Sequence, residues 1–121
     1  MRLEKITTGL NIKINKKGGN KMEDLESIVN EINILPKVDL STTVRYMTHP
    51  DYRVRFIAEY MQVKIRHDSL ENVLIKDELG ELDFSLSCSR DMLEDQLFNM
   101  KEYIESLKKR AIVEKIPLPR I

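Results

Sequence analysis

The stretch FIAEYMQVKIRHDSLENVL, residues 56–74, decides the fold because its stripe residues alternate steps of four and three along the chain. The stripe consists of Phe56, Tyr60, Val63, His67, Leu70 and Leu74. This spacing is the repeat of about 3.5 residues that lines the seam of a coiled coil. It predicts a long amphipathic helix that is capped by Thr48, carries Pro50 in its first turn, and runs to about Leu79. Gly80 supplies the stop.

A second stretch, LEDQLFNMKEYIESLKKRA at residues 93–111, repeats the pattern. Its stripe consists of Leu93, Leu97, Met100, Ile104, Leu107 and Ala111. Ser87 or Ser89 is expected to begin this helix, and Pro117 is expected to follow its end. The connector between the two helices is short, so they must pack antiparallel. We therefore predict an all-α fold whose main unit, residues 49–121, is an antiparallel hairpin of two long amphipathic helices.

Residues 22–48 are predicted to form one or two short helices before the hairpin. In the first, apolar residues recur three and four positions apart, at Leu25, Ile28, Val29 and Ile32. In the second, the stripe is expected at Leu40, Val44 and Met47.

Residues 1–21 form a basic leader that we expect to be disordered or a short strand. The run from Lys17 to Met22 back-translates to a purine-rich stretch just before a start codon, which is typical of a bacterial ribosome-binding site. We expect Met22 to be the true start and the leader to have no role in the fold.

Composition narrows the classes of function. The chain has 121 residues, enough for one small domain that would gain from self-association, so we expect a homo-oligomer. Its 20 basic and 20 acidic residues cancel, which disfavours nucleic acid or a membrane as partner. The sequence has one cysteine and no long apolar run, which indicates a protein of the cytoplasm.

The sequence shows no enzyme machinery, so we expect neither a catalytic residue, nor a metal, nor a cofactor. His49 and His67 are far apart, and we expect no paired ligand four residues away. Cys88 has no histidine nearby and is expected to be a buried, inert thiol. No glycine-rich phosphate loop opens a helix.

One cluster favours ligand binding. The candidate site residues are Tyr52, Arg55, Glu59, Tyr60 and Arg66 on the first long helix, with Gln96 and Arg110 on the second. Aromatic rings stack on nucleotide bases, and guanidinium groups bind phosphate through two hydrogen bonds. The alternative is a surface ladder of ion pairs, since Arg55 and Glu59 have the spacing of a common intrahelical pair.

The chain also resembles a family of small phage-encoded proteins of unassigned function, first noted in a crAss-like phage. The matching segments are Tyr46–Thr48, Pro50–Tyr52, Arg55–Phe56, Ala58–Tyr60, Gln62, Ile65–Arg66, Leu82–Phe84, Cys88, Arg90, Leu93–Glu94, Gln96–Leu97, Met100, Tyr103, Leu107 and Arg110–Ala111. The resemblance covers about Tyr46 to Leu118. It departs at Ser89, where proline is common, and at His67, where an aromatic residue is usual.

More distantly, the second helix resembles the helical sponge proteins with which phages counter CBASS and Thoeris immunity. This resemblance implies an anti-defence protein that sequesters a cyclic oligonucleotide or an ADP-ribose derivative, without cleaving it, in a pocket between subunits. It also implies that the protein acts in the cytoplasm of an infected bacterial host. An alternative is a protein–protein interaction module that inhibits a host defence effector through a helix face. That alternative predicts an exposed apolar patch at Val54, Ile57, Met61 and Ile65.

Overall fold

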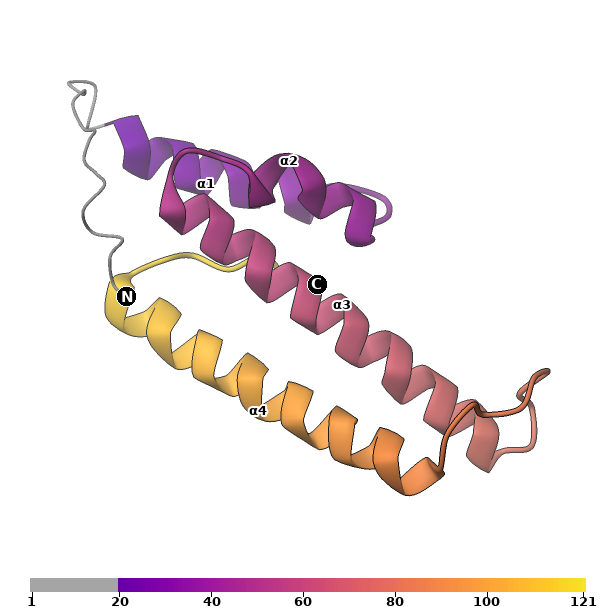
Figure 1. Cartoon of the computed structure of the whole chain (residues 1–121). Coiled ribbons are helices and arrows are strands. Elements are labelled where there is room, and N and C mark those ends of the chain that lie inside the picture. The colour runs from indigo at the N-terminus through magenta and orange to yellow at the C-terminus, as the bar shows by residue number, and fades with distance from the viewer. Residues whose placement is uncertain (1–19) are drawn as a thin grey trace.

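The computed structural model describes residues 20–121, and every regular element in this range is helical (Figure 1). The elements are α1 (Asn20–Asn33), the 3-10 helix η4 (Leu40–Thr43), α2 (Val44–Met47), α3 (Tyr52–Glu78) and α4 (Arg90–Glu114). The predicted all-α fold is confirmed, with the short helices where residues 22–48 predict them. The predictions for residues 1–19 lie outside the described residues.

Helices α3 and α4 form the predicted antiparallel hairpin (Figure 1). At the end of the hairpin near α1, the seam residues are buried: Phe56, Tyr60, Ile104, Leu107 and Ala111. Toward the connector several are only half-buried: Val63, Leu70, Leu93, Leu97 and Met100. Two helices alone are too narrow to enclose a core, so this arm of the hairpin leaves apolar surface partly open.

The start of α3 differs from the prediction. Asp51 is the N-cap, with extended backbone angles, and its carboxylate accepts a hydrogen bond from the Arg53 backbone N–H at 3.0 Å. The prediction that Thr48 caps the helix was wrong because Pro50 disfavours helical angles at His49, so the helix starts only after the proline. The other boundaries are confirmed. Leu79 is the C-cap, followed by Gly80 at φ +72°, and Ser89 caps α4 by accepting from the Met92 N–H at 3.2 Å.

Replacing Asp51 with alanine is expected to lower the free energy of unfolding by about 1–2 kcal/mol, because it removes the cap of α3. It also removes the ion pair between Asp51 and Arg53. Thr48→Ala is the matched control and is expected to cost less than about 0.5 kcal/mol, since Thr48 lies outside the helix. Urea denaturation measures both values, and equal losses would contradict the assignment of the cap.

The N-terminal helices cover a second face of α3, which is the main correction to the sequence prediction. Val54, Ile57 and Met61, predicted to form an exposed patch, are each at most 1% exposed, and Ile65 is partly buried against the same core. They share one core cluster with α1 and α2, through Leu25, Val29, Ile32 and Tyr46. The prediction was wrong because it considered only the contact between α3 and α4.

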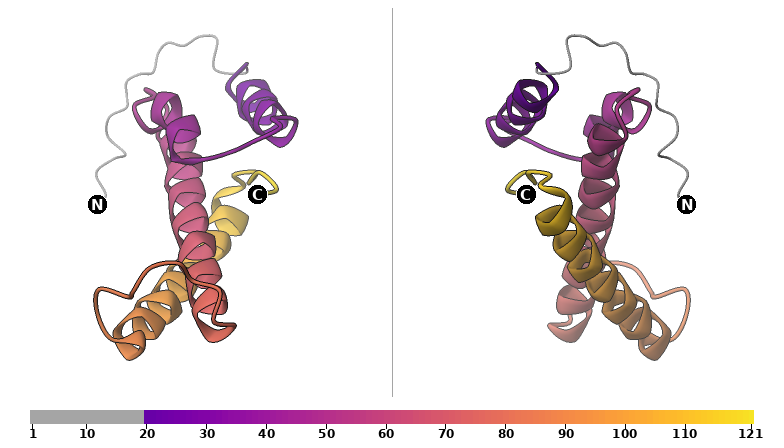
Figure 2. Two further views of the ribbon diagram at one scale, coloured as in Figure 1. Left: turned by 90° about the vertical axis from the view of Figure 1, so that its right-hand side faces the viewer. Right: turned by 90° about the vertical axis from the view of Figure 1, so that its left-hand side faces the viewer.

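The C-terminal tail, residues 116–121, completes this layer. It turns back from α4 and runs along α3 on the side of α1 (Figures 1 and 2). Ile116 is buried in the core cluster, and the Arg120 backbone N–H donates to the Asn33 side-chain oxygen at 2.8 Å. The tail therefore ties α1 to the hairpin.

The short segment η4–α2 buries Thr43 and Tyr46, whereas Val44 and Met47 of the predicted stripe are exposed. The Thr43 hydroxyl is fully paired, since it donates to the Leu40 carbonyl at 2.8 Å and accepts from the Gln62 amide at 2.9 Å. The tight 3-10 turn of η4 shifts which side chains face α3.

Among residues 20–121, no helix combines the length and hydropathy that crossing a bilayer requires.

Candidate functional site

Two stripes with a spacing of seven residues border the seam of the hairpin. On α3 the stripe is Tyr52, Glu59 and Arg66, and on α4 it is Gln96, Tyr103 and Arg110. Residues seven apart lie on one face of a helix. The antiparallel register brings the two stripes together, because the Tyr103 hydroxyl of α4 donates a hydrogen bond to the Glu59 carboxylate of α3.

Near the start of α3 and the end of α4, these stripes contribute to two bonded groups of side chains that interact electrostatically through Arg110, here together called the edge cluster. It consists of Tyr52, Phe56, Glu59, Tyr103, Arg110 and Glu114. The Arg110 guanidinium lies 4.6 Å from the centre of the Phe56 ring, and its Nε donates to Glu114 at 2.9 Å. The Tyr52 hydroxyl donates to the other Glu114 oxygen at 2.9 Å. A carboxylate thus holds an arginine over an aromatic ring, beside two further aromatic side chains.

The edge cluster is open to solvent. Tyr52 and Tyr103 are each 42% exposed, and the Arg110 side chain is 52% exposed. Tyrosine combines an apolar ring with a polar hydroxyl and is enriched at binding surfaces for that reason. The cluster therefore has the accessible rings and the accessible cation that stacking and phosphate binding require.

The electrostatics of the cluster keep its phenols neutral and its arginine charged. Burial raises the pKa of Tyr103 to about 12, and the hydrogen bond to Glu59 and the charge of Glu59 act in the same direction, while Arg110 opposes them. Burial and then the bond to Glu114 raise the pKa of Tyr52, and the bond to Glu114 raises the pKa of Arg110. At neutral pH the cluster thus offers neutral rings and a charged guanidinium.

Tyr103 is expected to ionise near pH 12, and Glu59→Gln is expected to lower its pKa. Because the folded-state pKa lies above the ordinary value of 10.0, the Tyr103 phenol stabilises the fold fully below pH 10, and this contribution is lost as the pH rises through about 12. The tyrosinate absorbance of the wild type minus that of Tyr103→Phe, measured during an alkaline titration, reports the ionisation of Tyr103 alone. If this difference rose near pH 10, the raised pKa of Tyr103 would be contradicted.

The remaining predicted site residues lie elsewhere or at the margin. Tyr60 is 5% exposed and belongs to the seam. Arg55 donates to the carbonyl oxygens of His49 and Pro50, at 2.6 and 2.9 Å, and the predicted ion pair between Arg55 and Glu59 does not form. Arg66 and Gln96 are exposed, and neither makes a hydrogen bond or ion pair with any residue in the range 20–121.

Sequence reasoning missed three members of the edge cluster. Phe56 was assigned to the seam only, and Tyr103 and Glu114 were not singled out as site residues. The heptad spacing from Gln96 to Arg110 passes through Tyr103, so this signal was present. Glu114 had no such signal, because its pairing with Tyr52 depends on how the two helices meet.

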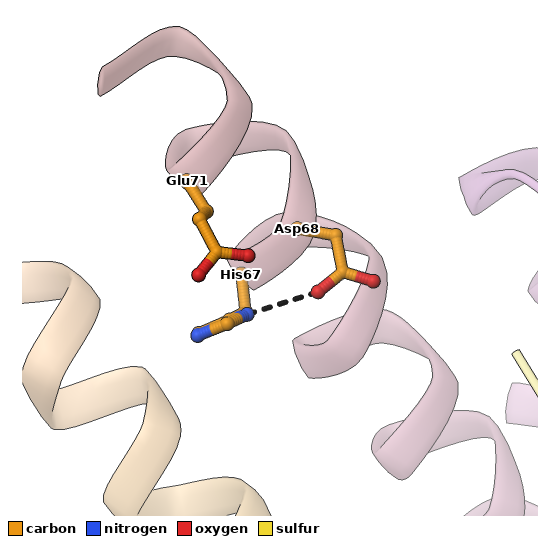
Figure 3. A group of neighbouring side chains, drawn as sticks. All are labelled: His67, Asp68 and Glu71. Atoms are coloured by element: carbon orange, nitrogen blue, oxygen red, sulfur yellow. Dashed lines mark hydrogen bonds and ion pairs between the residues drawn. The ribbon is translucent and has the colours of Figure 1, made fainter. Parts of the chain in front are cut away.

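A separate group of possible metal ligands lies farther along α3 (Figure 3). His67, Asp68 and Glu71 bring ligand atoms within 4.8 Å of one another, so the prediction that His67 lacks a partner at i+4 was wrong. That prediction considered only histidines as ligands and overlooked the carboxylate of Glu71. The His67 Nδ1 lies 3.0 Å from Asp68, whose other oxygen is paired with Lys64 at 2.7 Å. This existing ion pair competes with a cation, and the absence of a metal stays a prediction.

An open groove of about 460 Å³ lies beside the same segment, on another face of α3 from the edge cluster. Lys64, Ile65, Asp68 and the C-terminal Ile121 contribute to its lining, and none of the predicted site residues does. Cys88 is exposed and not buried as predicted, because the connector that carries it has no regular structure.

Comparison with known proteins gives a family. A family model called Sequestin matches residues 50–112, which include nearly all of α3 and α4. No curated protein and no solved structure matches the chain. The name of the family indicates a sequestering role and fits the expected likeness to small sequestering phage proteins. The crAss-like phage origin and the likeness to anti-CBASS and anti-Thoeris sponges stay predictions. Because the match covers more than half of its residues, the chain belongs to the Sequestin family.

Proposed function

We propose that this protein sequesters a nucleotide signal of host immunity, a cyclic oligonucleotide or an ADP-ribose derivative, at the edge cluster and without cleaving it. The observation that carries the proposal is the meeting of Tyr52, Glu59 and Arg110, predicted from two separate segments, on one side of the hairpin. The sequestering role that the family name indicates supports it.

The proposed roles follow from the chemistry of each side chain. Arg110 binds a phosphate with its free guanidinium nitrogens, because its Nε already holds Glu114. Tyr52 and Tyr103 stack on bases. Arg66 and Gln96, farther along the same stripes, contact a second phosphate or a sugar hydroxyl. All of these are binding interactions, so the ligand is not chemically changed and is released intact.

We propose that a second copy of the chain closes the site. A nucleotide site normally buries most of its ligand, whereas the edge cluster is open on one side. Large apolar side chains of α4 remain available for such a contact: Met92 at 63%, Phe98 at 62%, Ile112 at 78% and Val113 at 81% exposed. In this arrangement the ligand lies between two hairpins.

Isothermal titration against a panel of cyclic dinucleotides, cyclic trinucleotides and cyclic ADP-ribose isomers tests the proposal. We expect at least one ligand to bind with a dissociation constant below about 1 μM. After the complex is heated, chromatography is expected to recover the ligand intact. No heat with any member of the panel, or recovery of a cleaved product, would contradict the proposal.

The alternative, inhibition of a host effector through a helix face, has less support. The patch on which it relied, Val54, Ile57 and Met61, is buried within the chain. Exposed apolar side chains remain for such a partner on α4 and elsewhere, for example at Met47 and Phe84. Those of α4 are the residues that we assign to a second copy.

A further inference from the structure

The charges of the hairpin are separated along its length, although the chain as a whole has no net charge. Around the connector, residues 76–95 contain seven acidic residues and two basic ones. At the end of α4, residues 108–115 contain four basic residues and one acidic one. Figure 1 shows these two segments at opposite ends of the hairpin. We call residues 76–95 the acidic end and residues 108–115 the basic end.

The two ends cannot neutralise each other within one molecule. Even Asp95 and Lys108, their nearest charges along α4, are 13 residues apart, which is about 20 Å along the helix axis. Salt screens exposed charges beyond about 8–10 Å at physiological ionic strength. Inside the acidic end, the single guanidinium of Arg90 pairs with three carboxylates, so it cannot balance them. The net charge of each end is therefore available to another molecule.

Each end also exposes large apolar side chains among its charges. At the acidic end these are Leu79, Phe84 and Met92, and at the basic end they are Ile112 and Val113, all more than half exposed. Apolar side chains surrounded by charge of one sign mark a surface that fits a partner with the opposite sign. The acidic end of one copy and the basic end of another meet this condition.

We propose that two copies of the chain pair side by side and antiparallel, so that the acidic end of each contacts the basic end of the other. A two-fold axis makes this contact twice and uses both ends of both copies. A parallel pair would bring like charges together. This inference rests on the second copy that the proposed function requires, and it gives the orientation of that copy. The connector of the second copy then lies beside the end of α4 that carries Arg110.

Charge reversal tests the contact, with sedimentation velocity of the nucleotide-free protein measuring the dimer. We expect the wild type to be a dimer. Lys108→Glu/Lys115→Glu and Asp83→Lys/Asp95→Lys are each expected to raise its dissociation constant at least about 10-fold, because like charges then meet at both contacts. A variant with all four substitutions is expected to return to the wild-type value. All four side chains are exposed, and circular dichroism checks that each variant is folded.

Glu26→Lys/Glu71→Lys is the matched control, since it reverses two exposed acidic residues that lie outside both ends. We expect it to leave the dimer unchanged. An equal loss in this control would mean that any reversal of charge weakens the dimer, and would overturn the assigned contact.

Cross-linking tests the orientation. Cys88 is exposed in the connector, and Val113→Cys adds a second thiol at the basic end. With a short bismaleimide, the Val113→Cys protein is expected to form dimers in which Cys88 of one copy is linked to position 113 of the other, as mass spectrometry of peptides identifies. The wild type, whose Cys88 side chains lie at opposite ends of the pair, is expected to stay unlinked. Efficient linkage of Cys88 to Cys88 would overturn the antiparallel arrangement.

The outcomes separate this inference from the proposed function. A monomeric wild type, or a fourfold variant that fails to recover the dimer, would overturn the antiparallel pair, while heat with a nucleotide of the panel would still support sequestration. A dimer with the expected recovery and linkage that binds no nucleotide of the panel would contradict the proposed function and support the pair.

Discussion

Replacing Ile57 with alanine is expected to lower the free energy of unfolding by about 2–5 kcal/mol, the usual cost of truncating a large buried side chain. Ile57 is 0% exposed and lies in the core cluster that joins α3 to the N-terminal helices. Little room exists for the structure to relax around it, because its side chain is fully buried within this cluster. Urea denaturation followed by circular dichroism measures the loss.

Ile34→Ala is the matched control, since it removes the same atoms from a side chain that is 80% exposed and lies outside α4. Its effect on stability is expected to stay within about 0.5 kcal/mol. A nearly neutral Ile57→Ala would mean that the N-terminal helices do not cover α3, and the exposed patch predicted from the sequence would then return.

Replacing Arg110 with alanine is expected to weaken nucleotide binding by about 10- to 150-fold, because hydrogen bonds to a charged group contribute about 1.5–3 kcal/mol. The substitution removes the phosphate-binding guanidinium and frees Glu114, whose uncompensated charge then repels the ligand. Titration calorimetry measures the change with whichever nucleotide the wild type binds.

Lys109→Ala is the control for Arg110→Ala, since it removes the same charge from the neighbouring exposed position on α4. A loss limited to about threefold is expected, from the weaker overall field at the surface. Similar losses for both variants would indicate an unspecific electrostatic effect instead of a phosphate contact at Arg110.

The hairpin could be predicted because its signal is local. The alternation of four and three from Phe56 to Leu74, and again from Leu93 to Ala111, reports which face of each helix meets the other. The second buried face of α3 could not be read in this way. Its partners, such as Leu25 and Tyr46, come from separate elements, and a pattern within one helix does not say which segment will cover it.

The candidate site was likewise predicted only in part. Tyr52, Glu59 and Arg110 were identified from residue type and helix position, and the structure brings them into one cluster. Arg55 and Tyr60 were chosen on the same grounds but have other contacts. Arg55 pairs with carbonyl groups freed by the late start of α3, and Tyr60 fills the seam. Residue type indicates what a side chain can bind, and tertiary packing decides whether it is available.

Fluorine NMR of protein labelled with 3-fluorotyrosine tests the central claim most directly, because the chain has only four tyrosines. Tyr52 and Tyr103 belong to the edge cluster and are exposed, while Tyr46 and Tyr60 are buried and act as internal controls. Titration with the bound nucleotide is predicted to shift the resonances of Tyr52 and Tyr103 and to leave the other two in place. Binding that leaves Tyr52 and Tyr103 unchanged would contradict the edge cluster as the site.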